Sequence, residues 1–131
     1  MQPDFSGEWI LDRHASVLSS NAAAFQSGVM RIEHRDPNFR FQLRMIAGDQ
    51  PVEHAGEAVT DGKEVVGCGE VTRLYWDGDM LVMSCGPKEQ EAQWAMSFRY
   101  ELLDQGRRLR WFEQIHGDGR DQENTWIFER R

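Results

Sequence analysis

The chain has 131 residues, of which 40% are hydrophobic and 28% charged, as in one soluble globular domain. Its 15 Lys and Arg against 22 Asp and Glu give a formal net charge of -7. This acidic balance argues against binding to nucleic acid or to an anionic membrane surface, because both depend on basic side chains. No apolar run approaches the roughly 20 residues that span a bilayer, and residues 1–5 do not resemble a secretion signal. We therefore expect a cytoplasmic protein, as a monomer or a dimer.

Turn-forming residues recur at short intervals, and the segments between them are rich in β-branched and aromatic residues. Asp61-Gly62 and Asp77-Gly78 follow the pattern of β-hairpins, because the central residues of a type I′ turn need positive φ. Residues 39–45 and 94–102 carry large apolar side chains at every second position, which predicts half-buried antiparallel strands. The chain as a whole predicts strands near 6–12, 28–34, 39–47, 52–60, 63–66, 70–76, 80–85, 92–103, 108–116 and 123–130.

One segment departs from the β pattern. Residues 14–26 hold Leu18, Ala22 and Phe25 at helical spacing, and Gly28 follows as a C-terminal stop signal. The segment is too short to form a stable helix alone, so it must pack on the sheet. We expect a short helical lid between the first two strands.

The succession of hairpins predicts an all-β, closed, up-and-down antiparallel barrel of about 8–10 strands in one domain, residues 1–131. Closure removes the free edges of the sheet. It also requires an even number of strands when every neighbour is antiparallel. Splitting residues 63–76 at Gly67-Cys68-Gly69 gives ten strands, with the first paired to the last, and one continuous strand there gives nine. We therefore favour the split.

The opening Gly7-Glu8-Trp9 resembles the Gly-x-Trp strand of the calycins, the lipocalin and fatty-acid-binding-protein superfamily. The order of elements along the whole chain is similar to that of the intracellular fatty-acid-binding proteins. Residues 32–37 and 60–64 are also similar to small bacterial lipocalin-like proteins of unknown function. The resemblance implies a barrel that binds a small hydrophobic molecule. It also implies that Trp9 packs at the end of the barrel beneath a cation, for which Arg130 is the candidate.

Two departures from that family affect the ligand. The lid segment is shorter than the family's two helices, so the entrance is more open. The family holds its ligand's carboxylate with an Arg-x-Tyr pair on the last strand, and the matching positions here are Trp126 and Phe128. The cationic clamp is therefore missing from that strand. We expect a neutral or aromatic ligand in place of a plain fatty acid.

A ten-stranded barrel is wider than side chains alone can fill, so we expect an internal cavity. Met and aromatic side chains offer it adaptable apolar walls. The alternative is that the same stripes form a solid core, in which case the protein is an interaction domain with an exposed apolar patch. The expected lining residues, with Phe25 of the lid gating entry, are Phe41, Met45, Met83, Trp94, Met96, Phe98, Tyr100, Trp111, Trp126 and Phe128.

Two ionisable residues are candidates for polar contacts in the cavity. Pairing across residues 104–106 places Glu113 opposite Phe98, and an inward Glu113 would be a carboxylate in apolar surroundings. Pairing across Asp61-Gly62 places Ala58 opposite Val65, which turns His54 inward. Together with Tyr100, these residues would orient polar groups of the ligand. Alternatively, Glu113 would be the general acid and His54 the base or orienting group of a lipocalin-like isomerase, cyclase or hydratase. The plainer alternatives are an outward Glu113 at a bulge, an internal ion pair, or a His54 that is only hydrogen-bonded in the wall.

We expect neither a metal ion nor another cofactor. The four His are scattered over separate segments, without the short spacings of zinc ligands. No phosphate-binding Gly-rich loop or nucleophile elbow occurs in the chain. With the strand split at residues 67–69, Cys68 lies in a turn away from Cys85, and we expect both to be free thiols.

Overall fold

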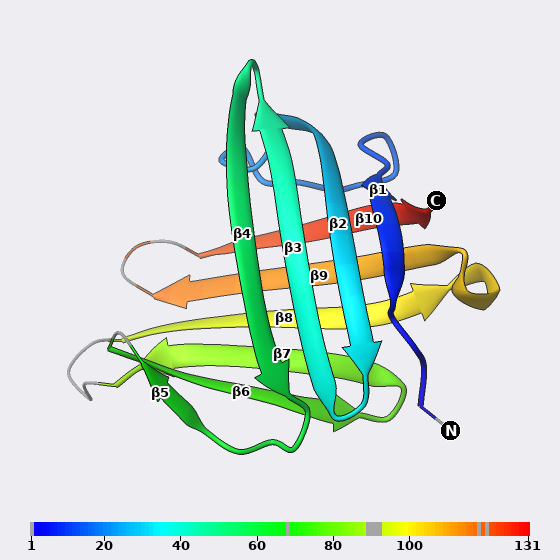
Figure 1. Ribbon diagram of the computed structural model, residues 1–131. Helices are drawn as coiled ribbons and strands as arrows, with labels where there is room; N and C mark the ends of the chain where they lie inside the picture. Colours follow the sequence, from blue (N-terminus) through cyan, green and yellow to red (C-terminus); the bar gives the residue numbers. More distant parts are fainter. Residues whose placement is uncertain (1, 68, 89–92, 118, 120) are drawn as a thin grey trace.

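Ten antiparallel strands form one curled sheet in the computed structural model, which describes residues 2–67, 69–88, 93–117, 119 and 121–131 (Figure 1). The elements are β1 (Gly7–Leu11), β2 (Phe25–Arg35), β3 (Asn38–Ala47), β4 (Gln50–Val59), β5 (Val65–Gly67), β6 (Glu70–Asp77), β7 (Met80–Pro87), β8 (Trp94–Leu103), the 3-10 turn η1 (Asp104–Gly106), β9 (Arg108–Gly117) and β10 (Gln122–Arg130). The predicted strands are confirmed to within a few residues. Residue 92 and Cys68 lie outside the described residues.

The order of strands across the sheet is β4-β3-β2-β1-β10-β9-β8-β7-β6-β5. Hairpins such as β6–β7 join neighbours, and Gly78 (φ 63°) supplies the positive φ that this tight turn requires. The predicted pairing of first and last strands is confirmed, with Trp9 opposite Arg130. The predicted split is confirmed too, because β5 ends at Gly67 and β6 begins at Glu70.

The sheet is a curled half-barrel, and the predicted closure is not seen. β4 and β5 are the two ends of the strand order, with no ladder joining them in the described part of the chain. Figure 1 shows β2, β3 and β4 crossing over the half formed by β6–β10. The two halves therefore enclose an apolar interior without forming a continuous ring of hydrogen bonds.

The predicted helical lid is wrong. Residues 12–24, here called the strap, form turns, with Ser19 O accepting hydrogen bonds from the N–H groups of Ala22 and Ala23. Val17 instead bridges to Thr125 of β10, with N···O distances of 2.8 Å in both directions. A helix this short is unstable alone, and β10 offers the strap ready backbone partners. Among the described residues no helix is long and apolar enough to cross a membrane.

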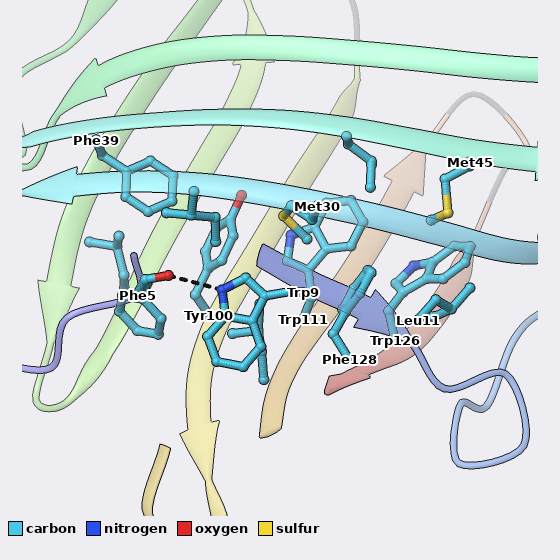
Figure 2. Packing of buried hydrophobic residues seen from close by; sticks show 14 of the residues in the cluster. Phe5, Trp9, Leu11, Met30, Phe39, Met45, Tyr100, Trp111, Trp126 and Phe128 are labelled. Atoms are coloured by element: carbon cyan, nitrogen blue, oxygen red, sulfur yellow. Dashed lines mark hydrogen bonds between the residues drawn. The ribbon is translucent and has the colours of Figure 1, made fainter. Parts of the chain in front are cut away.

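Aromatic side chains fill the interior where the two halves of the sheet meet (Figure 2). Trp9 is completely buried, its indole Nε1 donates to Phe5 O at 2.9 Å, and the Arg130 guanidinium lies 4.2 Å from the centre of its ring. The expected cation–π pair is thereby confirmed. The other buried aromatic residues of this core are Phe5, Phe39, Tyr100, Trp111, Trp126 and Phe128.

Asp36, which follows β2, connects both halves of the sheet near the β4–β5 gap. Its Oδ1 accepts hydrogen bonds from Thr60 Oγ1 (2.8 Å), Trp76 Nε1 (3.1 Å) and His34 Nε2 (3.1 Å). His34 Nδ1 accepts the N–H of Phe5, which assigns the proton to Nε2. Thr60 follows the edge strand β4, and Trp76 belongs to β6, the neighbour of the other edge strand β5, so one carboxylate links the two halves of the sheet at this end.

Candidate ligand-binding pocket

A pocket of about 240 Å³ lies between the strap and the ends of β3, β4, β9 and β10. Its walls are mainly apolar and aromatic, with a few polar groups among them, as is common for small-molecule sites. The lining residues are Asn21, Ala22, Phe25, Leu43, Met45, Val52, His54, Trp111, Glu113, Gln122, Asn124 and Trp126.

A larger cleft of about 1180 Å³ occupies the gap between β4 and β5. Its lining is strongly charged and includes Glu33, Arg40, Glu57 and Lys63. Arg40 already pairs with Glu57 at 3.2 Å and with Glu33 at 3.7 Å. Arg40, Glu33 and Glu57 are thus paired with one another and exposed to solvent, so the smaller apolar pocket is the better candidate for binding a hydrophobic molecule.

Six of the residues singled out in the sequence line the smaller pocket. Trp111 and Trp126 form one aromatic wall, with ring centres 6.0 Å apart, and Phe25 lies 6.1 Å from Trp126. The Trp111 Nε1 is buried without a hydrogen-bond partner among the described residues. The six residues are Phe25, Met45, His54, Trp111, Glu113 and Trp126.

The other seven do not line this pocket. Tyr100 and Phe128 are fully buried in the aromatic core, and burial raises the pKa of the Tyr100 hydroxyl well above its ordinary value. Phe98 stacks on Trp111 at 5.3 Å and, like Phe41 and Met83, packs half-buried against the core. Trp94 and Met96 are half-buried along β8.

Glu113 is the polar centre of the pocket. Its Oε1 accepts hydrogen bonds from Asn124 Nδ2 at 2.9 Å and from Trp126 Nε1 at 3.4 Å. The Asn124 side chain is buried, at 2% exposure, and its Oδ1 accepts the N–H of Ser19 at 2.7 Å. Asn124 therefore fixes the strap and the carboxylate to each other.

The sequence reading did not single out Asn124. It shares a face of β10 with Trp126 and Phe128, because side chains two residues apart point to the same side of a strand. That alternation was the available signal for an inward polar residue. The strap contacts from Asn21 and Ala22 had no comparable signal, because a helix was expected there.

The predicted register holds for Glu113, which lies opposite Phe98 on β8. The pairing used for His54 is wrong, because Ala58 lies opposite Phe39 of β3, whereas Val65 of β5 lies opposite Thr72 of β6. His54 is nevertheless part of the pocket lining, as an exposed residue. Within the described chain, no hydrogen bond joins His54 to Glu113, and no cluster of three potential metal ligands occurs.

The sheet is a meander that pairs its last strand with its first around an apolar interior. The resemblance inferred from the sequence is thus confirmed at the level of fold. Solved structures of other proteins share this arrangement.

The chain is similar to the REP1-NXSQ fatty acid transporter, with a TM-score of 0.66 and 13% identity over 98% of this chain and 96% of that one. Human cRBP IV gives 0.64 and 14% over 98% and 99%. Lipid binding protein 8 of Caenorhabditis elegans gives 0.66 and 14% over 97% and 95%. At these identities the likeness concerns the fold alone. No protein-family model and no curated protein sequence matches the chain.

Proposed function

We propose that the protein binds a small hydrophobic molecule in the pocket between the strap and β9–β10. The observation that carries this proposal is the apolar lining of the pocket, above all the wall of Trp111 and Trp126. Burial of apolar ligand surface against such walls gives about 25 cal/mol per Å². Similar structures named as a fatty acid transporter and a lipid binding protein support binding of this general kind.

By this proposal the body of the ligand is neutral or aromatic, and a fatty acid is disfavoured. Trp126 and Phe128 occupy the positions where the family resemblance implies a cationic clamp. Among the described residues that line the pocket there is no Lys or Arg, and a bound carboxylate would meet Glu113. The volume of about 240 Å³ lies below the roughly 300–1,000 Å³ of sites for drug-sized ligands, which favours a body of one or two rings.

Binding accounts for the geometry better than catalysis does. Acid–base catalysis by Glu113 and His54 would require both groups to converge on one substrate atom within hydrogen-bond reach. His54 is exposed, whereas the hydrogen bonds of Glu113 go to β10. We assign both residues to contacts with polar groups of the ligand.

Isothermal titration calorimetry with naphthalen-1-ylmethanol and 1-naphthoate tests this function. We expect saturable binding of the alcohol and binding of naphthoate at least about tenfold weaker, because its carboxylate faces Glu113. Trp126→Ala should weaken binding of the alcohol about tenfold by removing aromatic wall, and Trp94→Ala, outside the pocket, should not. Absence of saturable binding by either probe, or naphthoate binding as tightly as the alcohol, would contradict the proposal.

A further inference from the structure

The pocket combines apolar walls with one carboxylate and no cation that neutralises it. Of the lining residues only Glu113 and His54 are ionisable, and in the described chain no Lys, Arg or His forms an ion pair with Glu113. The formal net charge of the whole chain is also negative, at -7. A cation that enters this pocket therefore meets an attractive field from both near and distant groups.

Hydrogen bonds position the Glu113 carboxylate through one of its two oxygens, Oε1. Asn124 and Trp126 both donate to Oε1, which suits an ionised carboxylate because that group only accepts hydrogen bonds. No described residue donates to Oε2. Asn124 is itself buried and tied to the strap through Ser19, so the carboxylate is already positioned before any ligand arrives.

We propose that the ligand carries a protonated amine on its hydrophobic body and that this ammonium group pairs with the Glu113 carboxylate. The inference rests on the binding function proposed above and names the class of ligand. A charge-assisted hydrogen bond is roughly twice as strong as a neutral one, so an ammonium gains more from Glu113 than a hydroxyl does. The aromatic rings of Trp111 and Trp126 line the same pocket and attract a cation further.

The test compares three probes that share one ring system: naphthalen-1-ylmethylamine, naphthalen-1-ylmethanol and 1-(methoxymethyl)naphthalene. Their dissociation constants are measured by calorimetry at pH 7 and low ionic strength. We expect the amine to bind about tenfold more tightly than the alcohol, and the ether to bind most weakly. In Glu113→Gln, which keeps the shape and an acceptor oxygen for Asn124, the amine should lose its advantage and the alcohol should change little.

Glu123→Gln is the matched control. It removes the same charge from the outer face of β10, where Glu123 is exposed and accepts a hydrogen bond from Gln114 Nε2 at 3.1 Å. The amine's advantage should survive in this variant. Thermal unfolding followed by circular dichroism establishes that both variants are folded.

The outcomes separate this inference from the binding function. If the alcohol binds but the amine binds no better, or if Glu113→Gln retains the preference for the amine, the inference is overturned and the binding function stands. Loss of the preference in Glu123→Gln would likewise overturn it, because general surface charge would then be the cause. If none of the three probes binds, the binding function itself fails, and the inference fails with it.

Discussion

Asp36 illustrates how one polar side chain can hold distant segments together. Its partial burial acts to raise the pKa of its carboxyl, but hydrogen bonds from His34, Thr60 and Trp76 outweigh this and hold the pKa below its ordinary value. The folded protein therefore binds a proton at Asp36 less readily than the unfolded chain does. Stability from this group is present above the unfolded pKa of about 3.9 and is lost as the pH falls through the folded value.

We predict that Asp36→Asn lowers the free energy of unfolding at pH 7 and flattens its decline below about pH 4. The amide removes the charge that the three donors stabilise, and with it one group that takes up a proton on unfolding. Urea unfolding between pH 3 and pH 7 measures both effects. Asp79→Asn, at an exposed position in the β6–β7 turn, is the control. An acid slope in Asp36→Asn equal to that of the unchanged protein would count against this role.

At the same scale, the sequence predicted the inward Glu113 because strand alternation and hairpin register are both local. It placed His54 by a pairing between β4 and β5 that does not occur. His54 still lines the pocket because β3, which does pair with β4, puts it opposite the inward Leu43. Asn124 was not predicted because its side chain is neither apolar nor ionisable, and so nothing but its place in the alternation of β10 marks it.

At the scale of elements, strands were predictable and the strap was not. Period-2 patterns and turn residues lie within each strand, so β3 and β8 can be recognised without knowing their partners. Residues 14–26 have the spacing of a helix, but their backbone finds its partners on β10, more than one hundred residues away in the chain. Ser19 contributes through its N–H and its hydroxyl, which bind Asn124 and Gln122. Such long-range competition leaves no local pattern.

The pairing of the start of β8 with the end of β9 depends on a residue without a side chain. Gly117 has φ 97°, and a Cβ there would lie 1.8 Å from the carbonyl oxygen of Gln93. Gly48 in the β3–β4 turn also has positive φ (64°), but apart from its chain neighbours no described residue has an atom within 4 Å of its Cβ position. Gly48→Ala therefore isolates the conformational cost, and Gly117→Ala adds a steric clash.

We predict that Gly48→Ala destabilises the protein by about 1 kcal/mol, the usual cost of positive φ for alanine. Gly117→Ala should cost about 2 kcal/mol more, because the backbone at Gln93 and Trp94 has to move. Chemical denaturation of the two variants measures the difference. Equal losses in both would mean that the start of β8 and the end of β9 adjust freely around the added methyl group.

At the scale of the whole molecule, the gap between β4 and β5 is the feature that local reasoning could not supply. Closure of the barrel depends on the curvature of all ten strands together. An even number of strands shows only that an antiparallel sheet is able to close, not that it does. One residue did carry a signal. Pro51 lies in β4 and lacks a backbone N–H, and proline within sheets is confined largely to edge strands, strand starts and bulges.

Hydrogen exchange should report these two free edges. We predict that amides of β4 and β5 exchange faster than those of β9, which is paired on both sides, to β8 and β10. Exchange measured by NMR or by mass spectrometry of peptides resolves the strands. Protection of β4 equal to that of β9 would show that the β4 edge is covered in solution.

From one edge of the sheet to the other, the strands run from β5 to β10 in chain order and then from β1 to β4 in chain order. A circular permutant that ran from β10 into β1 and opened after β4 would make every pairing one between successive strands. In the natural order, Trp9 has to find Arg130 across nearly the full length of the chain. The seam between β1 and β10 thus carries the largest loop-closure entropy in the fold, and relocating the termini to the gap would remove it without changing any contact across the sheet.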